Sequence, residues 1–181
     1  PAVTVEVHLA NGLPSFTLVG LADVEVKEAR ERVRAAIVNA GLEFPNNQRI
    51  TVNLAPADLP KDSGRFDLPI ALGILAASGQ LPQSALDGCE FLGELGLTGE
   101  LRGMHGVLPA ALAVAESGRL LILPACNGAE AALVGDADVR TARTLLELCA
   151  ALRGQKSLPA AETTMAAETP PHLDLADVRG Q

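Results

Sequence analysis

One loop, between positions 56 and 67, concentrates the side chains with the clearest chemical potential. Lys61 and Arg65 lie there among aspartates at positions 58, 62 and 67. An ammonium and a guanidinium group in one loop could bind phosphate or a neighbouring subunit. The alternative is a rigid connection in which Arg65 pairs locally with an aspartate. The sequence leaves both interpretations open.

Motifs for nucleotide binding and nucleophilic catalysis are incomplete or absent. The string nearest to a phosphate-binding Walker A loop, residues 154–157, lacks a glycine directly before Lys156. Gly154 is also predicted to end a helix and not to open one. No Gly-x-Ser-x-Gly elbow occurs. We therefore expect no ATPase activity and no cofactor in this chain.

The potential metal ligands share no useful spacing. Without a Cys-x-x-Cys pair, three widely separated cysteines argue against a zinc site and favour reduced thiols in a cytoplasmic protein. We expect no metal site. The residues concerned are Cys89, Cys126, Cys149, His8, His105 and His172.

Charge limits the interactions with nucleic acid. The net charge is −8, from 14 basic and 22 acidic residues, so DNA binding would need a local basic patch. Four Phe with no Trp or Tyr argue against a stacking platform for single strands. Glu28 and Glu31 interrupt one of the basic faces, which could instead be a solvated face with salt bridges between turns. The candidates for DNA or interface contacts are Lys61, Arg65, Arg102, Lys27, Arg30 and Arg34.

Hydrophobic periodicity predicts strands and helices in mixed order. Alternating residues indicate strands over 3–9, 15–19 and 50–54, with a turn signal at Asn11–Gly12. An apolar stripe predicts a helix over 23–40, capped by Asp23 and ended by Gly41. A helix over 67–78, capped by Asp67, is apolar nearly all round and should be the central buried helix.

The second half continues the mixture. We expect a strand pair over 91–102, a helix over 106–117, and short strands over 120–123 and 138–141. Asn127 with Glu130, and Thr144 with Glu147, form capping-box patterns for two further helices. The fold class is therefore α/β in the α+β sense: a two-layer domain with a mixed sheet over residues 1–154. Residues 155–172 are predicted to be a flexible linker, and residues 173–181 the start of another, truncated domain.

Two segments, residues 50–78 and 93–124, resemble the peptidase-like domain of Lon proteases, which has a ribosomal-protein-S5-domain-2-like fold. The resemblance places the catalytic serine at Arg65 and the catalytic lysine at Leu108. Neither can act, because a Ser–Lys dyad needs a hydroxyl nucleophile and an amine base. Ser63 lies two positions early, and Lys61 beside it is expected to be solvated. We therefore expect no catalytic residues.

Longer runs, at residues 12–45, 50–82 and 174–181, resemble the ComM/YifB family of magnesium-chelatase-like AAA+ proteins. The resemblance implies that this chain is the Lon-like N-terminal domain, without its first strand, of a hexameric ring ATPase. ATP and magnesium would bind in the ATPase domain that follows. The family is similar to branch-migration helicases that act on DNA during natural transformation.

Three functions remain as alternatives. The chain is an accessory domain for ring assembly or DNA contact, a partner-binding module of a chelatase-like complex, or a Lon-type peptidase. The missing dyad argues against the third. The expected partners are its own AAA+ domain, further copies of the chain, and DNA. No membrane contact is expected, since apolar stretches such as residues 68–77 are too short to span a bilayer.

Overall fold

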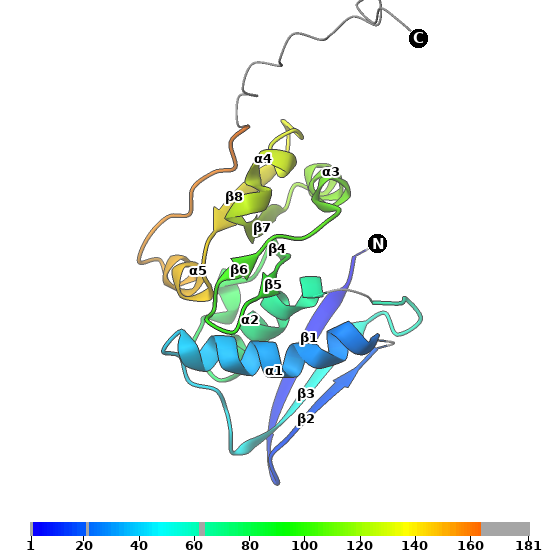
Figure 1. Ribbon diagram of the computed structural model, residues 1–181, viewed down its shortest axis with the longest axis vertical. Helices are drawn as coiled ribbons and strands as arrows, with labels where there is room; N and C mark the ends of the chain where they lie inside the picture. The colour runs from blue at the N-terminus through cyan, green and yellow to red at the C-terminus, as the bar shows by residue number, and fades with distance from the viewer. Residues whose placement is uncertain (1, 21, 62–63, 164–181) are drawn as a thin grey trace, which may run out of the picture.

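Mixed α/β architecture is confirmed by the computed structural model, which describes residues 2–20, 22–61 and 64–163 (Figure 1). In the orientation of Figure 1, β1 to β3 with α1 and α2 form the lower part, and the later strands with α3 and α4 form the upper part. The elements are β1 (Thr4–Asn11), β2 (Ser15–Val19), α1 (Val24–Asn39), β3 (Gln48–Ala55), α2 (Asp67–Ala77), β4 (Cys89–Phe91), β5 (Glu94–Leu95), β6 (Leu101–Arg102), α3 (Val107–Ser117), β7 (Leu120–Pro124), α4 (Gly128–Ala131), β8 (Asp138–Ala142) and α5 (Leu145–Leu152).

The first sheet has the strand order β1-β3-β2. β1 runs antiparallel to β3, with Thr4 opposite Ala55, whereas β2 runs parallel to β3, with Ser15 opposite Arg49. The turn at Asn11–Gly12 therefore does not close a simple hairpin, because β3 lies between the two strands that the turn connects. Parallel strands need a crossover connection, and α1 provides it between β2 and β3.

The two long helices of the lower part cover this sheet. α1 begins as predicted, because the Asp23 carboxylate accepts a hydrogen bond from the Val26 amide at 2.9 Å. α2 is the buried central helix that its composition predicts. The prediction that Asp67 caps α2 is wrong: Phe66 occupies the N-cap, and Asp67 is a fully buried member of the first turn.

The remaining strands form two further sheets instead of extending the first. β4, β7 and β8 make a parallel sheet, and β5 and β6 make a two-stranded antiparallel one. The predicted strand pair over 91–102 is thus shorter, since Phe91 ends a strand of the parallel sheet. The structure thus has three small sheets in place of the single mixed sheet that the sequence predicts. Two hydrophobic clusters, a main one and a smaller one, lie between these sheets and the helices.

The two capping-box patterns have different outcomes. Thr144 caps α5, because its hydroxyl accepts from the Glu147 amide at 3.1 Å. The short helix predicted from Asn127 and Glu130 is present as α4 with Asn127 at its N-cap, but the predicted capping bond is wrong, since the Asn127 side chain makes no capping bond to α4. Its side-chain amide instead bonds both backbone groups of Met104, at 3.0 and 2.9 Å. The Glu130 carboxylate accepts from the Leu108 amide at 3.2 Å, so both residues hold the start of α3.

The stretch expected as a linker begins with residues that pair with the parallel sheet. The Thr141 amide donates to the Pro159 carbonyl at 3.0 Å, and the Ala161 amide donates to the Val139 carbonyl at 2.9 Å. Leu158 packs on the main cluster and Ala161 on the smaller one. The rest of the expected linker and the expected start of a further domain, residues 164–181, lie outside the described residues. Among the helices of the described ranges, none combines the length and the apolar character that a membrane crossing requires.

Candidate functional site

The loop between positions 56 and 67 does not present its lysine to solvent. Only 2% of Lys61 is exposed, and its ammonium group donates to the Pro56 carbonyl. Its own carbonyl accepts from the Asp23 amide at 3.1 Å, which ties the loop to the start of α1. The expectation that Lys61 is solvated is therefore wrong. Its neighbour Ser63 lies outside the described residues.

A buried ion pair that the sequence interpretation missed lies under this loop. Arg32 of α1 donates to Asp67 twice, from Nε to Oδ2 at 2.6 Å and from Nη2 to Oδ1 at 3.1 Å. Asp67 also accepts from the Leu95 amide at 3.2 Å. Burial raises the pKa of Asp67, and the Arg32 guanidinium opposes that shift. The 35 positions between the partners leave no local signal for the pair.

The other candidates are dispersed over the molecule. Arg65 lies half-buried in a 3₁₀ turn (Gly64–Phe66), and its carbonyl accepts from the Gly93 amide at 3.2 Å. Arg102, on β6, lies 3.0 Å from Glu100 and 3.8 Å from Glu94, so carboxylates surround it. The side chain of Lys27 lies outside the described part of α1. Of the candidates whose side chains the structure describes, only Arg30 and Arg34 line one hollow together.

This hollow, which we call the arginine hollow, lies between α1, β2 and the start of β3. Its volume is about 300 Å³. Arg30 and Arg34 reach it from successive turns of α1, since residues four apart share a helix face. Among the described residues that line it there is no carboxylate, although Glu31 pairs with Arg30. The lining residues are Pro14, Ser15, Phe16, Arg30, Arg34, Phe44, Pro45, Asn46, Gln48 and Ile50.

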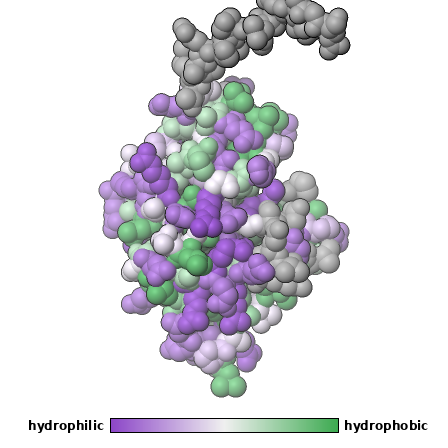
Figure 2. All heavy atoms as spheres, in the orientation of Figure 1, coloured by the Kyte–Doolittle hydropathy of each residue, from purple (hydrophilic) through white to green (hydrophobic). Residues whose placement is uncertain are grey.

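The side chains of Arg30 and Arg34 make only weak contacts with their neighbours in the chain. The Arg34 guanidinium lies 6.0 Å from the centre of the Phe44 ring, a cation–π contact at the edge of the useful range. Arg30 pairs with Glu31 at 3.3 Å, and about half of the Arg30 side chain is exposed. Such solvent-exposed pairs contribute at most about 1 kcal/mol, so an anion could displace the carboxylate. The region of Figure 2 where α1 and the first sheet face the viewer is mainly hydrophilic.

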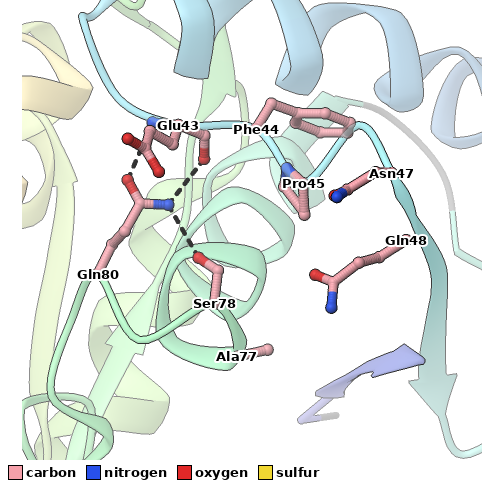
Figure 3. Close-up of a pocket in the computed structure, with 8 residues that line it drawn as sticks. All are labelled: Glu43, Phe44, Pro45, Asn47, Gln48, Ala77, Ser78 and Gln80. Atoms are coloured by element: carbon pink, nitrogen blue, oxygen red, sulfur yellow. Dashed lines mark hydrogen bonds between the residues drawn. The ribbon is translucent and has the colours of Figure 1, made fainter. Parts of the chain in front are cut away.

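A second hollow of about 350 Å³ adjoins the first and shares Phe44, Pro45 and Gln48 with it (Figure 3). We call it the amide pocket. Three of its side chains are the amides of Asn47, Gln48 and Gln80. Sequence reasoning missed this pocket, because α2 and the 41–48 connection, which form its walls, meet only in the tertiary structure.

The positions singled out for catalysis and for nucleotide binding can be compared with what those functions require. Arg65 and Leu108, at the positions of the Lon dyad, bring neither a hydroxyl nor an amine. Gly154 follows the end of α5 with a φ of +73°, so it terminates a helix, as predicted, whereas a Walker A loop leads into one. Within the described residues, no cluster of three or more His, Cys, Asp or Glu side chains could hold a metal ion.

Comparison with known proteins adds sequence relationships to this geometry. Residues 5–127 match the family model described as subunit ChlI of Mg-chelatase. The chain is 55% identical over 186 residues to the competence protein ComM of Haemophilus influenzae. It is 48% identical over 181 residues to the protein YifB of Escherichia coli. In both comparisons the match covers 100% of this chain, which spans 36% of each relative's length.

Proposed function

The chain belongs to the family of the Mg-chelatase subunit ChlI and has ComM and YifB as homologues, and on this premise we propose a non-catalytic accessory role in DNA handling. In this proposal the whole protein is an ATP-dependent DNA helicase of the AAA+ class that works in the cytoplasm as a hexameric ring. ATP and magnesium bind outside this chain. This chain contributes to DNA contact in branch migration, and the name of the Haemophilus relative, a competence protein, supports a link to natural transformation.

One observation carries the DNA contact: Arg30 and Arg34 line one hollow, and none of the described residues that line it is acidic. The guanidinium group is well suited to phosphate oxygens, because it offers several donors in a planar fork. The chain as a whole is acidic, with a net charge of −8, so a single copy should bind weakly. Several copies in a ring would bind far better, since one DNA molecule could engage several weak sites at once.

The test is fluorescence anisotropy of labelled DNA with the double variant Arg30→Ala/Arg34→Ala. Each lost phosphate contact should flatten the plot of log affinity against log salt by about one unit. The matched control is Arg119→Ala/Arg140→Ala, which removes the same charge at two other exposed arginines that pair with Glu90 and Asp138. Equal salt slopes for the two double variants would contradict the proposal.

An exposed apolar surface supports the second candidate, a partner-binding module of a chelatase-like complex. Leu112 on α3 is 51% exposed, Leu108 on the same face is 36% exposed, and Leu133 after α4 is 68% exposed. Exposed leucines close together favour protein contacts. Under this alternative, Leu112→Asp should shift the sedimentation equilibrium of the chain toward smaller species and leave DNA binding unchanged.

A further inference from the structure

The amide pocket has two kinds of wall (Figure 3). On one side, Asn47 and Gln48 point inward from the start of β3 and the residues before it. On the other side lie Gln80 and Ser78, which follow α2. Glu43 lies beside Gln80, and Pro45 lines both this pocket and the arginine hollow.

The Gln80 wall is rigid because its amide is fully engaged. Its oxygen accepts from the Glu43 amide at 2.9 Å. Its nitrogen donates to the Glu43 carbonyl at 2.7 Å and to the Ser78 hydroxyl at 2.8 Å. These bonds brace the 41–48 connection against the end of α2, so the pocket is formed before any ligand arrives.

The side-chain amides on the opposite wall are available to a ligand. Within the described residues, the structure shows no hydrogen bond from the side-chain amides of Asn47 and Gln48. Each of these amides offers one acceptor and two donor hydrogens. Glu43 also lines the pocket, beside Gln80. A complementary ligand is therefore a planar group with adjacent donors and acceptors.

We propose that the amide pocket receives the hydrogen-bonding edge of a nucleobase from single-stranded nucleic acid, while the neighbouring phosphate lies in the arginine hollow. Asparagine and glutamine amides pair bidentately with adenine, and a carboxylate accepts from the amino group of cytosine. The shared residues Phe44, Pro45 and Gln48 place the two hollows in direct succession. This assignment rests on the proposed DNA contact and adds a base-dependent component to it.

We expect single strands to enter the amide pocket more readily than duplexes, because their base edges are accessible. In a duplex the Watson–Crick edges are paired and stacked inside the helix, whereas a single strand can turn a base outward. Recognition by edges needs no exposed aromatic ring, which agrees with the low aromatic content of the chain. Arg34 already contacts the Phe44 ring, so that ring is not an open stacking surface.

The experiment compares three labelled oligonucleotides with the 181-residue chain by fluorescence anisotropy at low salt. They are a mixed-sequence single strand, an abasic single strand of the same length and charge, and a duplex. The intact chain should bind the base-containing strand about tenfold more tightly than the abasic one. Asn47→Ala, at a residue that lines the amide pocket and not the arginine hollow, should strongly reduce this difference and keep the affinity for the abasic strand. Gln83→Ala, an exposed amide elsewhere, should change neither.

The outcomes separate the two proposals. If Arg30→Ala/Arg34→Ala weakens binding but the intact chain does not distinguish base-containing from abasic strands, the base pocket is wrong and the DNA contact stands. The base pocket is equally wrong if Asn47→Ala retains the full preference. If the arginine variant binds all three as the intact chain does, or if no oligonucleotide binds, both proposals fail. Circular dichroism of each variant checks that its fold is intact.

Discussion

Arg32 and Asp67 form a two-pronged ion pair, with Nε–Oδ2 and Nη2–Oδ1 separations of 2.6 and 3.1 Å. The aspartate is fully buried and also accepts from the Leu95 amide, so the pair joins α1, α2 and β5. Asp67 lies in the first turn of α2, whereas the sequence alone predicts that Asp67 caps this helix.

Removing one partner of this pair should be strongly destabilising. Asp67→Ala removes the buried carboxylate that accepts from the Arg32 guanidinium and from the Leu95 amide, which should cost about 3 kcal/mol of unfolding free energy in urea denaturation. The double variant Arg32→Met/Asp67→Leu should lose less than the sum of its single variants, because it leaves no unpaired charge. A loss below about 1 kcal/mol for Asp67→Ala would contradict a structural role for the pair.

Lys61 should matter for stability and not for DNA binding. Lys61→Met keeps the apolar stem but removes the ammonium that bonds the Pro56 carbonyl, so unfolding free energy should fall by about 1.5–3 kcal/mol. The affinity for DNA should stay unchanged, because the side chain is buried. Thermal unfolding and anisotropy test the two statements separately. A drop in DNA affinity at unchanged stability would return Lys61 to the list of contact residues.

The three cysteines should differ in reactivity. Cys126 is exposed, Cys89 is half-buried and Cys149 is buried. Burial raises the pKa of the Cys149 thiol to about 11 and also raises that of Cys89. Iodoacetamide at pH 8 should therefore modify Cys126 first and Cys149 last, as followed by peptide mass spectrometry. Early modification of Cys149 in the folded chain would contradict its placement.

The same thiol should make stability depend on alkaline pH. The folded pKa of Cys149 lies above its ordinary value of 9.0, so the unfolded chain releases this proton first as pH rises. The contribution of the thiol to stability is complete below pH 9 and is lost between pH 9 and about 11. Urea denaturation across this window should show a shallower decline for Cys149→Ala than for the intact chain. Parallel plots of unfolding free energy against pH for the two proteins would contradict the raised pKa of Cys149.

The segment after α5 should behave as part of the parallel sheet. Ala161→Pro removes the amide that donates to the Val139 carbonyl, and it should accelerate hydrogen exchange at the Thr141 amide, whose acceptor lies in the same segment. Ala160→Pro is the matched control, because the structure shows no hydrogen bond from that amide among the described residues. Equal exchange at Thr141 in both variants would indicate that the segment is not held there.

Local patterns fixed those elements whose stabilising contacts lie within a few residues. The Asp23 cap and the Thr144 cap each join groups three positions apart, and both are confirmed. Alternation predicted β1, β2 and β3, and uniform apolarity predicted the burial of α2. Long motifs in the sequence also indicated the relationship to ComM and YifB, which the identities confirm. The likeness to the peptidase-like domain of Lon remains a prediction.

Tertiary structure decided which hydrogen-bond partner a polar side chain has when several are possible. Asp67 could cap its helix locally, but the buried position between Arg32 and Leu95 offers three hydrogen bonds at once. Asn127 likewise bonds Met104 instead of its own helix. Both hollows form where the 41–48 connection meets α1, α2 and the first sheet. Such contacts join residues tens of positions apart, and sequence periodicity describes only which face is buried, not which element covers it.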